Sequence, residues 1–467
     1  MNFQGKLITA YFIWINGSFK KNIFIKIDKE GKIEKIFFKE EEEESFKEVI
    51  DLGLVALLPG FVNVHSHAFH RELRGLSQIG ECGGDNFWKW RENMYKIVEN
   101  IDYEKMKQIC VNTFEEMLSA GITTVGEFHY VHHLNNSEGK FALDMAVVEA
   151  ACQVGIRLVI IETLYMRGGF SQPKINPEQW RFASQSIEQF IEHVNNLKDE
   201  LKNDDKYKGL ITIALAVHSL RAVPITEAHK LYQFSIQNNI PLHLHLEEQP
   251  LELKECQDVH SGRDPGQVLL EDIMTDEGTK KVDDSLITAV HCTYSKRSLL
   301  DEFVKRGINI CICPSTEGYL GDGIPNLDKF DNICLGTDCN NRIAMLEEQR
   351  WLAFCQNMRT NSRNCASLTA SKLLNCATIN GAKSLGILSK IGDFFINKHF
   401  DFFAINLDSK RLNQFNEEKK LLDAIIFSGG NEEILMAGIN GICNDSIPSR
   451  PIWQVKQRLA SLFLSNV

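Results

Sequence analysis

The sequence predicts an α/β fold: a (β/α)8 TIM barrel that carries a small composite β-sandwich domain built from both chain ends. Three observations predict it. Eight short apolar runs rich in β-branched residues recur along the chain, segments with helical periodicity lie between most of them, and strand-like pieces occur at both ends. Strands that are apolar on both faces and alternate with helices are typical of a closed parallel barrel.

The eight apolar runs are expected to form the barrel strands in chain order. Helical periodicity between them is clearest at 103–120 and 295–306, where apolar residues recur every three or four positions. The expected strands span 55–64, 123–129, 156–164, 210–218, 241–248, 285–292, 308–314 and 332–339.

The two ends of the chain predict a separate small domain. Residues 1–54 hold short strand-like pieces broken by Gly and Lys-Asn turns, and strand-like pieces return at 391–408. We therefore expect 1–54 and 391–467 to form one β-domain that ends in a terminal helix. The barrel is expected to occupy 55–390, with a linker near 386–391.

The composition is that of an ordinary globular protein, and it argues against some classes of binding partner. Of 467 residues, 43% are hydrophobic and 24% are charged. The net charge of −11 argues against nucleic acid or an anionic membrane as a partner. Thirteen cysteines without a CxxC pair, and the lack of a secretory signal, favour reduced thiols in the cytoplasm. No apolar run approaches the roughly 20 residues that span a bilayer.

Polar side chains gather where the predicted barrel strands end. In such a barrel the carboxyl ends of the strands meet on one rim and carry the chemistry. Any one of these residues alone is more simply a structural histidine or a capping acid, but together they predict one functional rim. The residues are His65, His67, Glu127, His129, Tyr130, His218, His243, His245, Glu248, His291 and Asp338.

Histidines and carboxylates on one rim are the donor set of a mononuclear metal hydrolase. Three neutral imidazoles and one carboxylate leave a divalent cation with a net positive charge and an open position for water. Such a cation lowers the pKa of water towards about 7. A nearby carboxylate must then carry a proton to the leaving group, and Glu248, three residues beyond His245, is placed for that role. His291, expected across the barrel, could hold the water or polarise the substrate.

The spacing of these residues resembles the deaminase branch of the amidohydrolase superfamily. The matching features are HxH at 65–67, HxHxxE at 243–248, a single His at 291, an Asp at 338 and CATINGAKSLGI at 376–387. The resemblance implies one Zn2+ per chain, or another divalent ion such as Fe2+ or Mn2+, and a homodimer. It also implies that His243 packs in its strand or supports a ligand. The implied metal ligands are His65, His67, His245 and Asp338, and the implied catalytic residues are Glu248, His291 and Asp338.

A narrower resemblance is to the formimidoylglutamate deiminase family. It rests on HSHAF at 65–69, FWKWRENMY at 87–95, EFHYVHH at 127–133, HSLRAV at 218–223 and TEGYLGDGI at 316–324. It implies hydrolysis of a C–N bond in a linear amidine, from N-formimino-L-glutamate to N-formyl-L-glutamate and ammonia in histidine degradation. Arginine suits bidentate carboxylate recognition. The residues that the resemblance implies for binding this dianionic substrate are Arg91, Tyr130, His218 and Arg221.

Two segments depart from the family pattern. His70 stands where the family has a Gln that touches the substrate, and Cys339-Asn340 stand where the family reads Ser-His after the aspartate. His70 can still donate or accept one hydrogen bond, so it stays among the expected substrate-binding residues. Because Asp338 is retained, the metal site is expected to survive both changes.

Two other functions stay open at this point. One is another aminohydrolase of the same branch, such as a guanine-type deaminase, which would be expected to stack its base in an aromatic pocket in place of paired arginines. The other is a non-catalytic binding protein, which the complete donor set and Glu248 argue against. Arg91 beside Trp88 and Trp90 could instead be a surface cation–π residue, and Arg221 a surface charge at a helix start.

Overall fold

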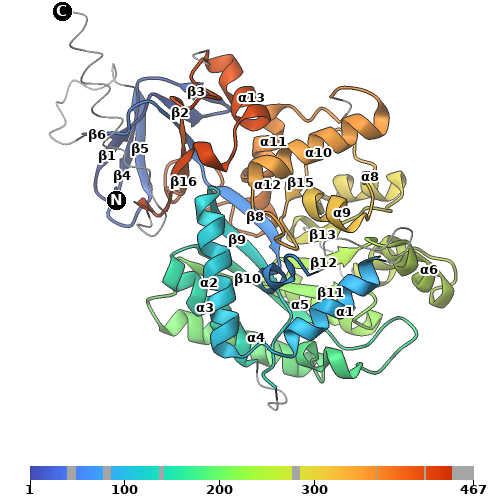
Figure 1. Cartoon of the computed structure of the whole chain (residues 1–467). Coiled ribbons are helices and arrows are strands. Elements are labelled where there is room, and N and C mark those ends of the chain that lie inside the picture. The colour runs from blue at the N-terminus through green and yellow to red at the C-terminus, as the bar shows by residue number, and fades with distance from the viewer. Residues whose placement is uncertain are drawn as a thin grey trace, which may run out of the picture.

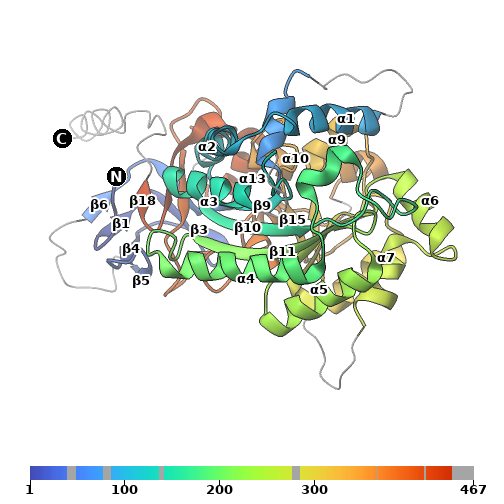
Figure 2. The same ribbon diagram turned by 90° about the horizontal axis from the view of Figure 1, so that it is seen from below.

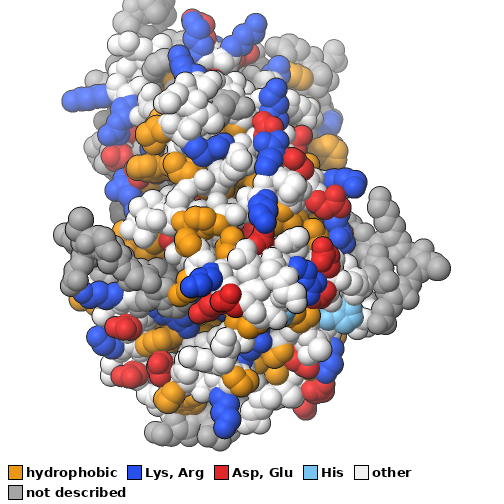
Figure 3. Space-filling model, turned by 90° about the vertical axis from the view of Figure 1, so that its right-hand side faces the viewer, with side chains coloured by type: hydrophobic (Ala, Val, Ile, Leu, Met, Phe, Trp, Pro, Cys, Tyr) orange, Lys and Arg blue, Asp and Glu red, His pale blue; other side chains and the backbone are white. Residues whose placement is uncertain are grey.

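The structure is a computed structural model that describes residues 1–38, 49–76, 86–135, 141–275, 284–364, 366–414 and 417–443. The predicted terminal helix lies outside these residues. Within these ranges no helix has both the length and the hydropathy to cross a bilayer, and the cysteines are free thiols. Figure 3 shows one face of the molecule, on which basic and acidic side chains are interspersed among small apolar groups.

Eight parallel strands form a nearly closed barrel, in which each strand pairs with its neighbours in chain order (Figure 1). The predicted (β/α)8 fold is therefore confirmed. Nearly every strand residue is buried, as expected of strands with a packed interior on one side and helices on the other. The strands are β8 (Phe61–Ser66), β9 (Ile122–His129), β10 (Arg157–Leu164), β11 (Ile211–Ser219), β12 (Leu242–Leu246), β13 (Ile287–His291), β14 (Asn309–Ile312) and β15 (Ile333–Leu335).

The barrel closes where its first and last strands meet, and this seam lies on the rim of the predicted site. The amide of Asp338 donates a hydrogen bond to the carbonyl of His65 (2.9 Å), and the amide of His67 donates to the carbonyl of Asp338 (3.0 Å). Ser66 and Asp338 form a parallel bridge. The closure therefore places residues from opposite ends of the barrel sequence side by side.

Helices cover the outside of the barrel (Figure 2). On α2 the buried side chains, among them Met106, Cys110 and Met117, recur on one face. The Asp102 side chain caps its start by accepting a hydrogen bond from the Lys105 amide (2.8 Å). The predicted helices 103–120 and 295–306 correspond to α2 and α8. The helical segments are η2 (Ala68–Leu73), α1 (Asn86–Val98), α2 (Tyr103–Ser119), α3 (Ala142–Val154), η3 (Pro177–Phe182), α4 (Ile187–Asn203), α5 (Ile225–Asn238), α6 (Pro250–Val259), α7 (Pro265–Val268), η4 (Leu269–Ile273), η5 (Asp284–Leu286), α8 (Arg297–Arg306), α9 (Pro314–Leu320), α10 (Met345–Thr360), α11 (Ala370–Cys376) and α12 (Ile379–Ser384).

Two sheets from the chain ends form the small domain beside the barrel (Figure 1). One sheet has the strand order β5-β4-β1-β6, and the other has β18-β17-β16-β7-β2-β3. Side chains of both sheets, including Ile8, Ile25 and Phe402, share one buried core, so the sheets pack as the predicted sandwich. The elements are β1 (Leu7–Thr9), β2 (Phe12–Ile15), β3 (Ser18–Lys20), β4 (Ile23–Ile27), β5 (Ile33–Phe38), β6 (Val49–Asp51), β7 (Val55–Pro59), β16 (Phe402–Asn406), α13 (Glu418–Ser428), η6 (Asn431–Glu433), β17 (Ile434–Ile439) and β18 (Ile442–Cys443).

The predicted boundary between the small domain and the barrel is wrong by one strand. The sequence predicts one barrel strand over 55–64. In the structure β7 pairs with β16 and β2 of the six-stranded sheet, and the barrel begins with β8 after Gly60. Gly60 connects β7 to β8 and faces Thr123 of β9. A Cβ at this position would lie 2.0 Å from the Thr123 hydroxyl, so only glycine fits here. A strand that is buried on both faces looks the same in sequence in either domain.

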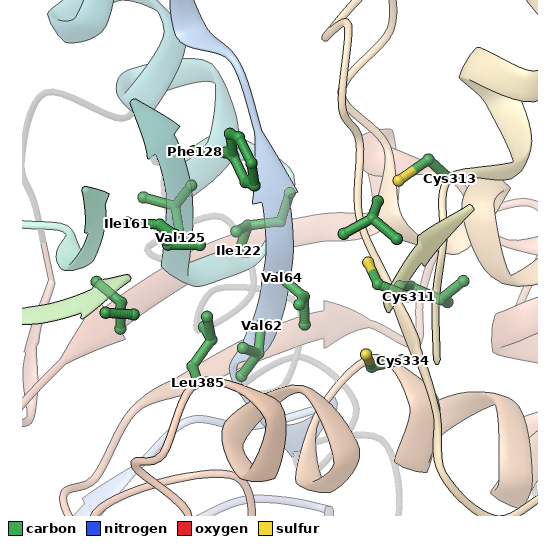
Figure 4. Packing of buried hydrophobic residues seen from close by; sticks show 14 of the residues in the cluster. Val62, Val64, Ile122, Val125, Phe128, Ile161, Cys311, Cys313, Cys334 and Leu385 are labelled. Atoms are coloured by element: carbon green, nitrogen blue, oxygen red, sulfur yellow. The ribbon is translucent and has the colours of Figure 1, made fainter. Parts of the chain in front are cut away.

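A continuous apolar core fills the barrel and the layer beneath its helices. Figure 4 shows part of this core, to which Val62 and Val64 of β8 and Cys311 of β14 belong. At the junction of the domains Phe61 packs on Phe403 of β16, with ring centroids 4.3 Å apart. The rim of the barrel is therefore held by a packed scaffold on which side chains at the strand ends can be positioned.

Candidate active site

Six of the predicted polar residues meet at the carboxyl-terminal rim of the barrel. They come from β8, β12 and β13 or from the segments that directly follow β8, β12 and β15. All six are buried, so the rim holds several polar groups out of bulk water. The residues are His65, His67, His245, Glu248, His291 and Asp338.

The four predicted metal donors lie close to one another. The Nε2 atoms of His65 and His245 are 3.2 Å apart. The Oδ1 of Asp338 lies 3.3 Å from the Nε2 of His67 and 3.6 Å from the Nε2 of His65. Ligand atoms bound at about 2.0–2.2 Å to one tetrahedral ion lie roughly 3.3–3.6 Å from one another. These three distances therefore match the spacing expected of ligands that share one ion.

Backbone carbonyls orient two of the imidazoles. The Nδ1 of His67 donates to the carbonyl of Phe128 (2.9 Å), and the Nδ1 of His245 donates to the carbonyl of His218 (2.8 Å). A carbonyl only accepts, so the proton of each neutral ring lies on Nδ1 and the lone pair lies on Nε2. The two Nε2 lone pairs therefore face the donor set, as metal-binding histidines require.

The charge states also suit a divalent cation. Burial lowers the pKa of His65, His67 and His245 and so keeps the three imidazoles neutral. Burial alone would raise the pKa of Asp338, but the facing His65, His291 and His67 hold that pKa below its usual value. One ionised carboxylate with three neutral imidazoles fits a metal of this class. The residues present thus fit the metal that the sequence led us to expect.

Glu248 faces both His291 and Arg221 beside the donor set. Its Oε1 lies 3.8 Å from the Nε2 of His291, and its Oε2 lies 3.8 Å from a terminal nitrogen of Arg221. Burial raises the pKa of Glu248, while His291 and Arg221 oppose the rise. A carboxyl group held in this position can carry a proton between water and a leaving group.

Glu317, which is not among the predicted site residues, lies behind His291. Its Oε1 is 3.5 Å from the Nδ1 of His291 and accepts a hydrogen bond from the Cys313 amide (3.0 Å). Burial alone would lower the pKa of His291, but Glu248, Glu317 and Asp338 raise it to about 10. Glu317 therefore faces the Nδ1 side of the imidazole, while Nε2 faces Glu248 and Asp338. Glu317 lies in the TEGYLGDGI segment at 316–324 that resembles the family, but only the packing of α9 against the rim shows that its side chain lies behind His291.

Several strand ends carry non-glycine residues in the left-handed backbone region. They include Glu247 (φ 54°), His291 (φ 75°) and Asp338 (φ 44°). This conformation is unfavourable for residues with a Cβ and persists where the surrounding structure holds it, often at functional sites. Here it lies at or directly beyond the ends of β12, β13 and β15, where the chain turns at the rim.

A cavity of about 350 Å³ opens over the donor set. All the residues expected to bind substrate line this cavity, and Arg91 reaches it from α1. His70 lies on η2, and Tyr130 directly follows β9. His218 and Arg221 come from the end of β11 and the residues just after it. The lining residues predicted from the sequence are His70, Arg91, Tyr130, His218 and Arg221.

Arg91 and Arg221 both lie close enough to His218 in the cavity wall to change its pKa. After burial itself, Arg221 and Arg91 are the main groups that lower the pKa of His218. The side chain of Arg221 is only 11% exposed, which excludes a simple surface charge. Its Nε is buried and has no hydrogen-bond partner within the described ranges. A positively charged wall with an unfilled donor fits an anionic ligand.

The two departures from the family pattern have partners in the structure. Asn340 donates from Nδ2 to the Ser66 hydroxyl and to the His67 carbonyl, both at 3.0 Å. It therefore ties the segment after β15 to the segment that carries the first two donors. His70 contacts Tyr130, with the ring Nε2 3.1 Å from the hydroxyl.

Glu127 supports the same segment from β9. Its carboxylate accepts hydrogen bonds from the Ser66 hydroxyl (2.6 Å) and the Ala68 amide (2.5 Å), on either side of His67. Burial raises the pKa of Glu127 to about 8. The sequence predicts Glu127 at a strand end but gives it no role. A carboxylate within an otherwise apolar run is the feature that indicates a special role for this residue.

Two histidines of the predicted rim point away from the cavity. The Nε2 of His243 lies 3.3 Å from the carbonyl of Ser384, and the Nε2 of His129 lies 3.0 Å from Asp144 of α3. Phe128 packs against the imidazoles of the donor set. Because side chains alternate along β9, His129 next to Phe128 faces the helices. Position at a strand end therefore does not decide which face a side chain occupies.

Comparisons with known proteins agree on one family. The amidohydrolase family model matches residues 56–442. Formimidoylglutamate deiminase from Pseudomonas aeruginosa is 31% identical over 393 residues, which cover 81% of this chain and 82% of that protein. A 5-methylthioadenosine/S-adenosylhomocysteine deaminase from Acetivibrio thermocellus is 23% identical over 427 residues, which cover 88% of this chain and 87% of that protein.

A solved structure shares the fold over almost the whole chain. The crystal structure of an adenosine deaminase from Xanthomonas campestris with bound zinc is similar with a TM-score of 0.78 at 19% identity. The match covers 98% of this chain and 99% of that chain. The barrel and the small domain therefore occur together in a known architecture.

Proposed function

Because the chain belongs to the amidohydrolase family, we propose that it is a hydrolase of carbon–nitrogen bonds that converts N-formimino-L-glutamate to N-formyl-L-glutamate and ammonia. The observation that carries the proposal is the placement of Arg91 and Arg221 in the same cavity as the metal donors. A substrate with two carboxylates and an amidine needs both features. The 31% identity to the deiminase from Pseudomonas aeruginosa supports the same substrate, and the purine-type relative is more distant at 23%.

The proposed cofactor is one Zn2+ per chain, held by the three Nε2 atoms and the aspartate carboxylate. Amidohydrolases are typically metal-dependent, and a structural neighbour contains zinc. Imidazole and carboxylate donors also suit Fe2+ or Mn2+. When bound, such an ion supplies a Lewis acid that lowers the pKa of water. The proposed ligands are His65, His67, His245 and Asp338.

Glu248 is proposed to move the protons of the reaction. It takes a proton from the water that attacks the amidine carbon and passes it to the nitrogen that leaves. Both protons of the water end on that nitrogen, so ammonia departs as the new C–O bond becomes a carbonyl. His291, with Glu317 on its Nδ1 side, is proposed to hydrogen-bond the attacking oxygen through Nε2.

Positive side chains on the cavity wall are proposed to orient the substrate. Arg91 and Arg221 bind its carboxylates, so that the amidine reaches the donor set in one orientation. The unfilled Nε of Arg221 supports this role. His70, Tyr130 and His218 complete the proposed contacts to the carboxylates and the formimino group.

The location and the assembly of the enzyme are proposed from the sequence and from the family resemblance. We propose that the enzyme acts in histidine degradation in the cytoplasm as a homodimer, without a nucleic-acid or membrane partner. The free thiols among the described residues support the proposed location, and the net charge of −11 supports the lack of an anionic partner. The homodimer is proposed from the family resemblance.

Release of ammonia tests the proposed substrate. Protein of measured metal content is assayed with N-formimino-L-glutamate, a guanidino acid and guanine, and kcat/KM is expected to be highest for N-formimino-L-glutamate. Guanine is the informative competitor because Trp90, Tyr130 and Tyr165 also line the cavity and could stack a base. A higher kcat/KM for guanine would replace this function with that of a purine-type deaminase.

A further inference from the structure

Two tyrosines line the cavity with Arg91 and have no role in the reaction described above. Tyr95 lies on α1, and Tyr165 directly follows β10. Behind them lies Gln179 of η3, whose side chain is fully buried. Its Nε2 is 3.2 Å from the Tyr95 hydroxyl and 2.9 Å from the Tyr165 hydroxyl. One buried amide therefore links two hydroxyl groups from separate parts of the barrel rim.

The far end of this amide determines the direction of both hydrogen bonds. The Oε1 of Gln179 accepts a hydrogen bond from the backbone amide of Asn176 (3.1 Å). A backbone N–H only donates, so the oxygen of the side chain must face Asn176 and the NH2 group must face the tyrosines. The NH2 group also only donates. Each tyrosine oxygen therefore accepts one of its two N–H groups.

Arg91 adds a second donor on the same side. Its Nε donates to the Tyr95 oxygen (2.5 Å). Its guanidinium also faces the Tyr165 hydroxyl, where the positive charge lowers the pKa of Tyr165 and so opposes the effect of burial. A tyrosine oxygen accepts up to two hydrogen bonds and donates its single proton once. Across the described ranges neither hydroxyl donates to a protein acceptor. Burial raises the pKa of Tyr165, so its hydroxyl keeps its proton at neutral pH. Both O–H protons are thus available to a ligand in the cavity.

We propose that Tyr95, Tyr165 and Arg91 form a donor-only cradle for one substrate carboxylate, and that Gln179 is the positioning residue that sets its polarity. The identity of the ligand rests on the proposed function, and the cradle adds a basis for selectivity. A carboxylate offers only acceptors and can satisfy all of these donors. A carboxamide in the same place would turn its own N–H groups towards donors, so the cradle discriminates against it.

Gln179→Glu tests the polarity with little change of shape. The new carboxylate would keep one oxygen for the Asn176 amide, and its other oxygen would accept the tyrosine protons and withdraw them from the ligand. We expect the KM for N-formimino-L-glutamate to rise about tenfold to a hundredfold, as for the loss of one charge-assisted hydrogen bond or more. The kcat should change little, because the reacting atoms lie elsewhere.

Gln189→Glu is the matched control. Gln189 also accepts a backbone hydrogen bond through Oε1, from the Gln185 amide (2.9 Å), but it lies at the start of α4 away from the cavity. Its KM should equal that of the wild type. Thermal unfolding and metal content are measured for every variant. If Gln179→Glu does not fold, Tyr95→Phe and Tyr165→Phe decide the question, since each should raise KM with the metal retained.

Substrate analogues provide a readout that a purely structural role would not change. N-formimino-L-glutamine and N-formimino-L-isoglutamine each replace one carboxylate by a carboxamide. The wild type should discriminate against at least one of them, and Gln179→Glu should lose most of that discrimination. Equal proportional losses for all three substrates, or unchanged KM in both tyrosine variants, would overturn the cradle.

Failure of the proposed function is distinguishable from failure of the cradle. If the wild type releases no ammonia from N-formimino-L-glutamate, the proposed function fails. Calorimetric binding of glutarate, which has two carboxylates and no formimino group, then tests the cradle on metal-loaded protein. Weaker binding by Gln179→Glu than by the wild type and Gln189→Glu supports it. Equal binding by all three proteins, or no binding by the wild type, overturns it.

Discussion

The backbone carbonyl of Asp338 accepts a hydrogen bond from the amide of His67 (3.0 Å), while its carboxylate Oδ1 lies 3.3 Å from the Nε2 of the same histidine. One pair of residues therefore closes the barrel and contributes two of the four expected metal donors. Closure of the fold and assembly of the site are thus the same structural event. A metal bound there would stabilise the closed barrel in addition to supporting catalysis.

His67→Ala should abolish activity and reduce the metal content well below one ion per chain, because one of four donors is lost. Elemental analysis of dialysed protein and ammonia release measure the two effects. His399→Ala, in the small domain, is the control and should retain both. A His67→Ala protein with full metal content and full activity would contradict the proposed donor set.

Glu248→Gln should retain the metal and lose about two to four orders of magnitude in kcat, since an amide cannot carry the proton to the leaving nitrogen. Stopped-time ammonia assays on metal-quantified protein measure the loss. The neighbouring Glu247 is the matched position for a control. Its carboxylate is turned away from the cavity and accepts from the Gly266 amide (2.8 Å) and the Ser295 hydroxyl (2.5 Å).

Glu247→Gln should therefore act on stability and leave the chemistry intact. We expect the unfolding temperature to fall by a few degrees, because one buried hydrogen bond is weakened, and the kcat of the folded protein to stay close to that of the wild type. Equal losses of kcat at positions 247 and 248 would contradict the proton-carrying role of Glu248.

Arg221→Met should lower kcat/KM for N-formimino-L-glutamate by about one to two decades, the effect of losing one charge-assisted contact. Metal content should not change, because Arg221 is not a donor. Steady-state kinetics measure the loss, and Arg363→Met, at an exposed position, is the control. If Arg221→Met and Arg363→Met are indistinguishable, the proposed carboxylate contact is wrong.

Glu348 gives the protein a pH-dependent component of stability. Its buried carboxyl group on α10 accepts from the amide (3.0 Å) and the hydroxyl (2.5 Å) of Ser315 on α9. Burial raises the pKa of Glu348 from 4.5 to about 8. Between these values the folded state holds a proton that the unfolded state has released. The stabilising contribution is therefore complete below about pH 4.5 and is lost as the pH rises towards about 8.

Replacing Glu348 by Gln should remove this component. The free energy of unfolding of the wild type, measured against that of Glu348→Gln by urea titration, should fall with rising pH by at most about 1.4 kcal/mol per pH unit between about pH 5 and about pH 8. Glu302→Gln, at a surface position, should show no such slope. A difference that is constant or that increases with pH would contradict the raised pKa of Glu348.

Several features of the site could be predicted because they depend on local patterns. The strand predicted at 123–129 and the observed β9 differ by one residue, since a short apolar run bounded by polar residues marks a buried strand. The donors were found as polar residues at the ends of such runs. His129 shows the limit of this method, because its position at a strand end does not say that it faces Asp144 on α3.

The sequence by itself determined the barrel and the residues at its rim, because apolar periodicity records which local side chains are buried. Only the tertiary structure decided that β7 belongs to the small domain, that Glu317 lies behind His291 and that Gln179 joins two tyrosines. Each of these outcomes depends on a partner that is distant in the chain. The physical reason is that these hydrogen bonds and strand pairings form between segments that are distant in the chain. They depend on how those segments pack when the barrel closes, and the local sequence of one segment does not specify its partner.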